Sequence, residues 1–258
     1  TTAGNNSAFG HRALDANTTG DNNSAFGNNA LGANTTADKC TSVGSNCLNS
    51  NTTGGSNTAY GYQAAYSNTT GNTNTALGYE SLYTNVAGDR NTAVGLQSFY
   101  TMNPSGNADT YNTGLGYQSG YATTTGTNNT AIGALALAAN TTGANNVSVG
   151  ANALDANTTA DANVGVGVDS LTANSTGASN TAVGTNALSA NTTSSNNTAV
   201  GKDALGANTT GTSNVALGAN ALDANTTSSD NTAIGFESLS SNTTGSQNTG
   251  IGQRALFS

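Results

Sequence analysis

Asn180-Thr-Ala-Val-Gly184-Thr-Asn-Ala-Leu188-Ser-Ala-Asn191-Thr-Thr-Ser-Ser-Asn196 is one copy of the unit from which this 258-residue chain is built. A glycine returns at every seventeenth position, with one longer gap, in fifteen copies of the unit: Gly10, Gly27, Gly44, Gly61, Gly78, Gly95, Gly116, Gly133, Gly150, Gly167, Gly184, Gly201, Gly218, Gly235 and Gly252. Self-similarity at a short fixed period is typical of a stacked solenoid rather than of a globular domain. We number positions in each unit from this glycine, which is position 0.

Two rows of large apolar residues run through the repeat. Position −1 is always large and apolar, and position +4 is Leu in twelve of the fifteen units. Positions −2 and +3 carry only Ala, Ser, Gly or Cys, as expected where two segments of a narrow coil face each other. We expect the −1 and +4 rows to point inward and form the core.

The residues that interrupt each unit predict strands rather than helices. The Gly, the Thr pair and the Asn residues of each unit leave no run long enough for a stable helix. We expect a strand at −4 to −1, a glycine turn at 0 to +2, a second strand at +3 to +6 and a wider return at +7 to +12. The predicted fold is an all-β, single parallel β-solenoid domain over residues 1–258, with about 15 coils stacked at ~4.8 Å into a rod of roughly 70 Å.

Asparagine occupies two fixed positions of the unit. It fills −4 in fourteen units, where Cys40 is the exception, and +7 in twelve. Identical amides stacked at the coil spacing can bond to each other and to turn backbone, which predicts two asparagine ladders. The alternative is N-glycosylation, because Asn-Thr-Thr fits the acceptor pattern.

Composition excludes several classes of function. Hydrophobic residues make up 34% of the chain and charged residues 7%, with a net charge of −8 and five Lys and Arg scattered along it. No basic stripe is present to neutralise phosphates, and no apolar run approaches the ~18 residues that span a bilayer. The sequence contains no recognisable catalytic triad, carboxylate pair or phosphate-binding loop. We expect neither a nucleic-acid partner, nor membrane embedding, nor an enzyme, nor a cofactor.

Two cysteines depart from the consensus within one coil. Cys40 replaces the −4 Asn, and Cys47 replaces the usual Ala or Ser at +3. A metal site would need more ligands, and the sole His is distant at His11. We predict a disulfide between Cys40 and Cys47, which suits an extracellular protein, with two buried free thiols as the alternative.

All nine tyrosines lie between Tyr60 and Tyr121. In register, seven of them form two rows, a +1 row of Tyr62, Tyr79 and Tyr117 and a +5 row of Tyr66, Tyr83, Tyr100 and Tyr121. The same stretch holds a four-residue insertion, which we expect to form a loop over residues 102–111. Exposed aromatic rows suit a contact with another chain or the stacking of a carbohydrate, and the remaining alternative is local packing that compensates for small +4 residues at Ala65 and Gly120.

Aspartates recur at +5 and in the returns, as at Asp155 and Asp161. Their spacing lacks the Gly-Gly-x-Gly-x-Asp pattern of calcium-binding β-rolls, so we expect local caps rather than a metal site.

The segments Asn129-Thr-Ala-Ile-Gly-Ala-Leu-Ala136 and Asn197-Thr-Ala-Val-Gly-Lys-Asp-Ala204 resemble the head repeat of YadA-like trimeric autotransporter adhesins, whose motif is Asn-Ser-Val-Ala-Ile-Gly. Similar repeats occur in phage tail-fibre proteins. The unit here is longer than the family's, and Thr mostly stands where the family has Val, three residues before the glycine. The resemblance implies a left-handed parallel β-roll on a surface-exposed fibrous protein that is usually trimeric.

Three functions follow from these observations. The first is an extracellular structural fibre, and the alternatives are a surface adhesin or phage receptor-binding region with a carbohydrate or cell-surface receptor as partner, and an ice-binding protein. The first residue of the chain occupies position +8 of the unit and the last occupies position +6, and neither end has the capping repeat that usually closes a solenoid. We therefore expect a homo-oligomer at the cell or virion surface, joined head to tail in preference to a trimer, with Thr1, Thr2, Leu256, Phe257 and Ser258 at the junction.

Overall fold

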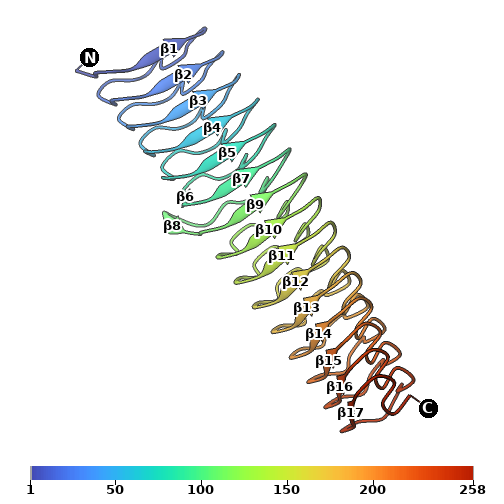
Figure 1. The fold of residues 1–258 in the computed structure, drawn as a ribbon. Coiled ribbons are helices and arrows are strands. Elements are labelled where there is room, and N and C mark those ends of the chain that lie inside the picture. Colours follow the sequence, from blue (N-terminus) through green and yellow to red (C-terminus); the bar gives the residue numbers. More distant parts are fainter. Residues whose placement is uncertain (1, 258) are drawn as a thin grey trace. The chain divides into compact units, whose positions relative to one another are not determined.

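The computed structural model describes residues 2–257, and within that range it contains β-strands and turns but no helix. The protein is an all-β parallel β-solenoid (Figure 1), in which equivalent positions of neighbouring coils lie seventeen residues apart except across the insertion. The fold class expected from the repeat is confirmed. The chain divides into two compact units, Thr1–Asn128 and Asn129–Ser258.

The first unit holds one parallel sheet with a strand from each coil, and a smaller pair of strands beside it. Adjacent strands pair residue for residue at the repeat distance, as in Ser7 with Ser24, and Thr92 pairs with Thr113 across the insertion. The strands are β1 (Ser7–Phe9), β2 (Ser24–Phe26), β3 (Thr41–Val43), β4 (Thr58–Tyr60), β5 (Thr75–Leu77), β7 (Thr92–Val94) and β9 (Thr113–Leu115), and the smaller pair is β6 (Gly88–Asp89) with β8 (Ala108–Asp109).

The second unit repeats the same architecture without an insertion. Thr181 pairs with Thr198 and Val183 with Val200, and the same register holds between all neighbouring strands of the unit. Its strands are β10 (Thr130–Ile132), β11 (Val147–Val149), β12 (Val164–Val166), β13 (Thr181–Val183), β14 (Thr198–Val200), β15 (Val215–Leu217), β16 (Thr232–Ile234) and β17 (Thr249–Ile251).

The strand that every coil contributes lies at −3 to −1, and no described strand lies at +3 to +6, so the prediction of a second strand there is wrong. The residues at +2 and +4 adopt left-handed backbone conformations, as at Asn186 (φ 57°) and Leu188 (φ 52°), which a β-strand does not allow. The segment instead winds as a turn whose amides still bond to the next coil, for example Leu188 N–H to Ala204 O at 3.1 Å. This repeated bonding holds a bulky residue in a conformation that L-amino acids usually avoid.

Glycine at position 0 is required by close stacking as well as by its backbone angle. Gly184 has φ of +135°, and a Cβ placed on it would lie 2.5 Å from the carbonyl oxygen of Gly201 in the next coil. No side chain fits there without separating the coils, which explains why position 0 of the repeat is always glycine.

The core consists of the −2, +3 and +4 rows, and the expectation that the −1 row points inward is wrong. In β13, Ala182 is fully buried while Val183 is 36% exposed. Successive side chains of a strand point to opposite faces, so burying the small residue at −2 turns the large residue at −1 outward. The +4 row fills the interior instead, and Leu171, Leu188 and Leu205 are fully buried.

Both predicted asparagine ladders are confirmed. At +7, Asn174 donates from Nδ2 to Oδ1 of Asn157 (3.1 Å) and to the carbonyl of Gly177 (2.9 Å). At −4, Asn180 accepts the backbone N–H of Asn197 and donates to the carbonyl of Ser194 (2.9 Å). These amides are fully buried and hydrogen-bonded. In the interior of the ladder, no +7 amide of the folded coils is therefore accessible for glycosylation.

Candidate interaction surfaces

The outer sheet face of each unit is formed by the −3 and −1 residues of the strands. In the second unit its −1 row is aliphatic throughout, with Leu217 46% and Ile234 36% exposed. Its −3 row carries Thr or Val. The rows are Thr130, Val147, Val164, Thr181, Thr198, Val215, Thr232 and Thr249, and Ile132, Val149, Val166, Val183, Val200, Leu217, Ile234 and Ile251.

The same face of the first unit carries larger side chains in the −1 row. Phe26 is 45% exposed, Tyr60 61% and Leu115 48%. Neither row of either unit contains a charged residue. Contiguous exposed apolar surface is typical of interaction sites, so this face is a candidate for one.

This surface was missed in the sequence because large apolar residues were assigned to the core. The signal that identifies it is the residue at −2, which is always Ala, Ser or Gly. A position that tolerates only small residues between two larger ones lies on the crowded side of a strand. The larger neighbours must then lie on the other side.

The tyrosines of the +5 row form a continuous stack in the first unit. The ring centroids of Tyr66 and Tyr83 are 5.3 Å apart, those of Tyr83 and Tyr100 5.1 Å, and those of Tyr100 and Tyr121 5.3 Å, with interplanar angles of 10°, 5° and 5°. Each inner ring therefore has both faces covered by its neighbours. Burial raises the pKa of the Tyr83 and Tyr100 hydroxyls above their usual value.

The +1 row is less regular and more exposed. Tyr62 and Tyr79 stack at 5.5 Å and 20°, and Leu96 occupies the position between Tyr79 and Tyr117. Tyr62, Tyr79 and Tyr117 are each 45–50% exposed. A carbohydrate would stack on an open ring face, which the inner rings of the +5 row do not offer. A contact with another chain stays a prediction for the +1 row.

Local packing accounts for two of the unusual +4 residues in this stretch, Phe99 and Gly120. Phe99 replaces Leu at +4 and is fully buried. A Cβ on Gly120 would lie 2.3 Å from the Phe99 ring, and one on Gly114 would lie 2.8 Å from it. The two glycines thus make room in the following coil for the ring that replaces a leucine.

The insertion, predicted as a loop over residues 102–111, contains the short strand β8, which pairs with β6. Thr110 is a buried extra residue whose hydroxyl donates to the carbonyl of Asp89 (2.9 Å) and to Oδ1 of Asn91 (2.8 Å). Arg90 forms an ion pair with Asp109 and lies 5.5 Å over the Tyr111 ring. These contacts tie the loop to the preceding coil.

The predicted disulfide between Cys40 and Cys47 is not formed, and both residues are buried free thiols. Cys40 takes over the role of the ladder amide and donates from Sγ to the carbonyl of Gly54 (3.3 Å). Cys47 fills the +3 row, where Ala is usual. Each thiol occupies the place of the residue it replaces, and these two places lie in different rows of the coil.

Burial raises the pKa of both thiols, that of Cys47 from 9.0 to about 11. Because the thiolate is the reactive form, we expect iodoacetamide at neutral pH to label neither residue in the folded protein and both after denaturation without reductant.

The fold favours the neutral thiol of Cys47 over its thiolate. The stability that this preference contributes is complete below the pKa of the unfolded thiol, and it is lost as the pH rises from about 9 to 11. The variant Cys40→Asn/Cys47→Ala, which restores the consensus, should lack this part of the alkaline loss. A native protein whose thiols stay unlabelled after denaturation would instead reveal a disulfide.

Aspartates in the returns act as caps between coils. Asp38 accepts the backbone N–H of Asp21 (2.7 Å), and Asp161 accepts that of Ala144 (2.7 Å), where no backbone carbonyl serves the amide. Among residues 2–257, no group of three or more His, Cys, Asp or Glu side chains is placed to hold a metal ion.

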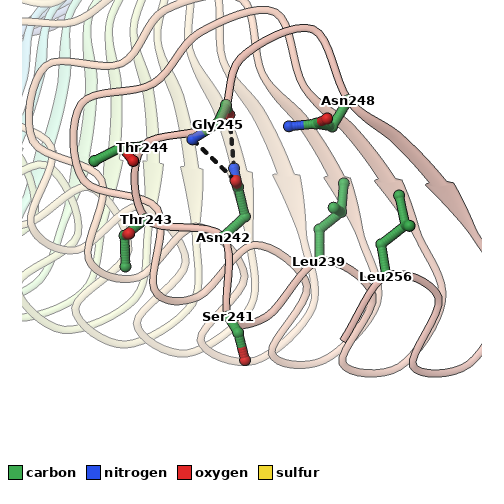
Figure 2. Close-up of a pocket in the computed structure, with 8 residues that line it drawn as sticks. All are labelled: Leu239, Ser241, Asn242, Thr243, Thr244, Gly245, Asn248 and Leu256. Carbon is green, nitrogen blue, oxygen red and sulfur yellow. Dashed lines mark hydrogen bonds between the residues drawn. The ribbon is translucent and has the colours of Figure 1, made fainter. Parts of the chain in front are cut away.

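The predicted end-to-end contacts are only partly described, because Thr1 and Ser258 lie outside residues 2–257. Thr2 is exposed, Leu256 is 58% exposed and Phe257 45%. Figure 2 shows the interior of the last described coils, where Asn242 bonds to both backbone groups of Gly245 beside Leu239 and Leu256. Leu239, one coil earlier in the same row, is only 3% exposed.

The described part of the chain contains no helix of a length and apolarity that would allow it to cross a membrane. Comparison of the sequence with models of known protein families and with characterised proteins finds no match to either.

Proposed function

We propose that the protein is an extracellular structural protein, a fibre subunit whose chains associate side by side through the outer sheet face. The observation that carries this proposal is the pair of uncharged rows at −3 and −1, held in register on parallel strands and exposed to solvent. Burying apolar surface releases about 25 cal/mol per Å², and a row that repeats at every coil adds this gain along its length. The resemblance of the repeat to surface-exposed fibrous proteins supports the same role.

The partner proposed is another copy of this chain. Identical chains aligned in parallel present matching rows at matching heights, so every coil meets an equivalent coil. Sparse charge removes most of the repulsion between copies.

End-to-end stacking is a second proposed mode of association, supported by the repeat itself, because each coil stacks in register on an equivalent coil. Contacts of this kind do not close on themselves and produce filaments, so side-by-side and end-to-end contacts are compatible within one fibre.

A lysine scan distinguishes the outer sheet face from the rest of the coil. We expect Val183→Lys/Leu217→Lys/Ile234→Lys to abolish side-by-side association, because it places three like charges in the apolar row. The control Thr193→Lys/Thr227→Lys/Thr244→Lys adds the same charge ten residues further along the same coils, on exposed positions of the return. Sedimentation velocity should find the control associated like the wild type and the outer-face variant dissociated, with similar melting temperatures. Unchanged association of the outer-face variant would contradict the proposal.

A further inference from the structure

We propose that the +5 tyrosine stack, formed by Tyr66, Tyr83, Tyr100 and Tyr121, is a site of oxidative cross-linking that joins neighbouring coils of one chain as dityrosine. Four phenols in four consecutive coils, nearly parallel and 5.1–5.3 Å apart, make this stack the longest aromatic row in the described chain. The proposal concerns a single chain and does not depend on how chains associate.

The reaction needs a one-electron oxidant, and we name a peroxidase with hydrogen peroxide as its class. Each of two phenols loses one electron and one proton to give a phenoxyl radical. One carbon–carbon bond then forms between ring carbons ortho to the oxygens, and each of these carbons loses a proton while each oxygen regains one. Hydrogen peroxide takes up the two electrons and two protons, and two water molecules result.

The architecture favours coupling within the stack over coupling between chains. Parallel strand pairing fixes Tyr66 and Tyr83 in adjacent coils, as Thr58 pairs with Thr75 at the start of those coils. A radical formed on any ring therefore has a second phenol beside it, and such proximity replaces an encounter between molecules. The rings are half-buried, which keeps phenols of other chains at a distance while leaving the edge of the stack open.

The cross-link would supply a covalent tie that the chain otherwise lacks. Cys40 and Cys47 are free, and adjacent coils are held by hydrogen bonds and packing. A dityrosine between coils closes a loop of about 17 residues, and such closure restricts the unfolded chain as a disulfide does.

The test treats the dilute protein with a peroxidase and hydrogen peroxide and identifies linked peptides by mass spectrometry. We expect links between Tyr66 and Tyr83, Tyr83 and Tyr100, or Tyr100 and Tyr121, each with the loss of two hydrogen atoms and with a yield that does not change on dilution. Tyr83→Phe/Tyr100→Phe keeps the stacked rings but leaves no two adjacent phenols, and it should lower the +5 yield at least tenfold. The control Tyr60→Phe/Tyr117→Phe removes two exposed phenols outside the stack and should leave that yield unchanged.

Melting temperatures within a few degrees of the wild type show that both variants keep the fold. The proposal is overturned if no +5 link forms in the wild type, if Tyr83→Phe/Tyr100→Phe cross-links as well as the wild type, or if links arise mainly between chains and increase with concentration.

Discussion

Leu188→Asp is expected to lower the free energy of unfolding by about 4 kcal/mol or more, because it places a carboxylate without a partner among fully buried leucines. Leu171 and Leu205 lie in the same row of the neighbouring coils and are fully buried, so the new charge would stand in an apolar row. Urea denaturation followed by circular dichroism measures the effect.

The matched control for this substitution is Val183→Asp in the same coil. Val183 lies on the outer sheet face and is 36% exposed, so its replacement should change the stability of the single chain by no more than about 1 kcal/mol. The reverse order of the two effects would show that the −1 row, and not the +4 row, forms the core.

Asn174→Leu is expected to have the second largest effect, a loss of about 3 kcal/mol or more, although the new side chain is similar in size and apolar. The substitution removes the donor to Asn157 Oδ1 and to the Gly177 carbonyl, and the acceptor for Asn191 Nδ2 (2.8 Å). Buried groups that lose their partners cost about 1–3 kcal/mol each. Two-thirds of this loss or more should persist at high salt, because the bonds are buried and uncharged.

Thr176→Leu provides the control, since it introduces the same side chain at an exposed position two residues later in the same coil. We expect it to change stability by about 0.5 kcal/mol at most. A stable Asn174→Leu variant would mean that the ladder follows from the fold without contributing to it.

The sequence predicted those features that depend on the period. A repeat with a glycine fixed at every seventeenth position requires each coil to stack on an equivalent coil, and buried identical amides at one spacing can satisfy one another. The fold class, the +4 row and both ladders follow from this reasoning.

Features that depend on side-chain direction within the coil were not predicted correctly. Val183 was assigned to the core by its size, whereas the small Ala182 beside it occupies the inward side of the strand. The turn conformation at Asn186 and Leu188 was not foreseeable from propensity, because left-handed leucine is unfavourable in isolation and is held here by bonds between coils.

The candidate surfaces were predicted in part. The tyrosine rows of the first unit were located by register, but the stacking of the +5 rings on one another required coordinates. Cys40 and Cys47 depart from consensus in one coil, which suggested a bond between them, yet each thiol replaces a residue in a different row. Departure from the consensus in one coil therefore did not imply a disulfide.

Cryo-electron microscopy of the protein at high concentration tests the central claim most directly, since it shows both the direction of each row and the contacts between chains. Our account predicts parallel coils of one repeat each, with the Leu188 row inside each chain and the Val183 row buried between neighbouring chains in a fibre. A population of single chains with the Val183 row in water, or an assembly in contact through another face, would contradict it.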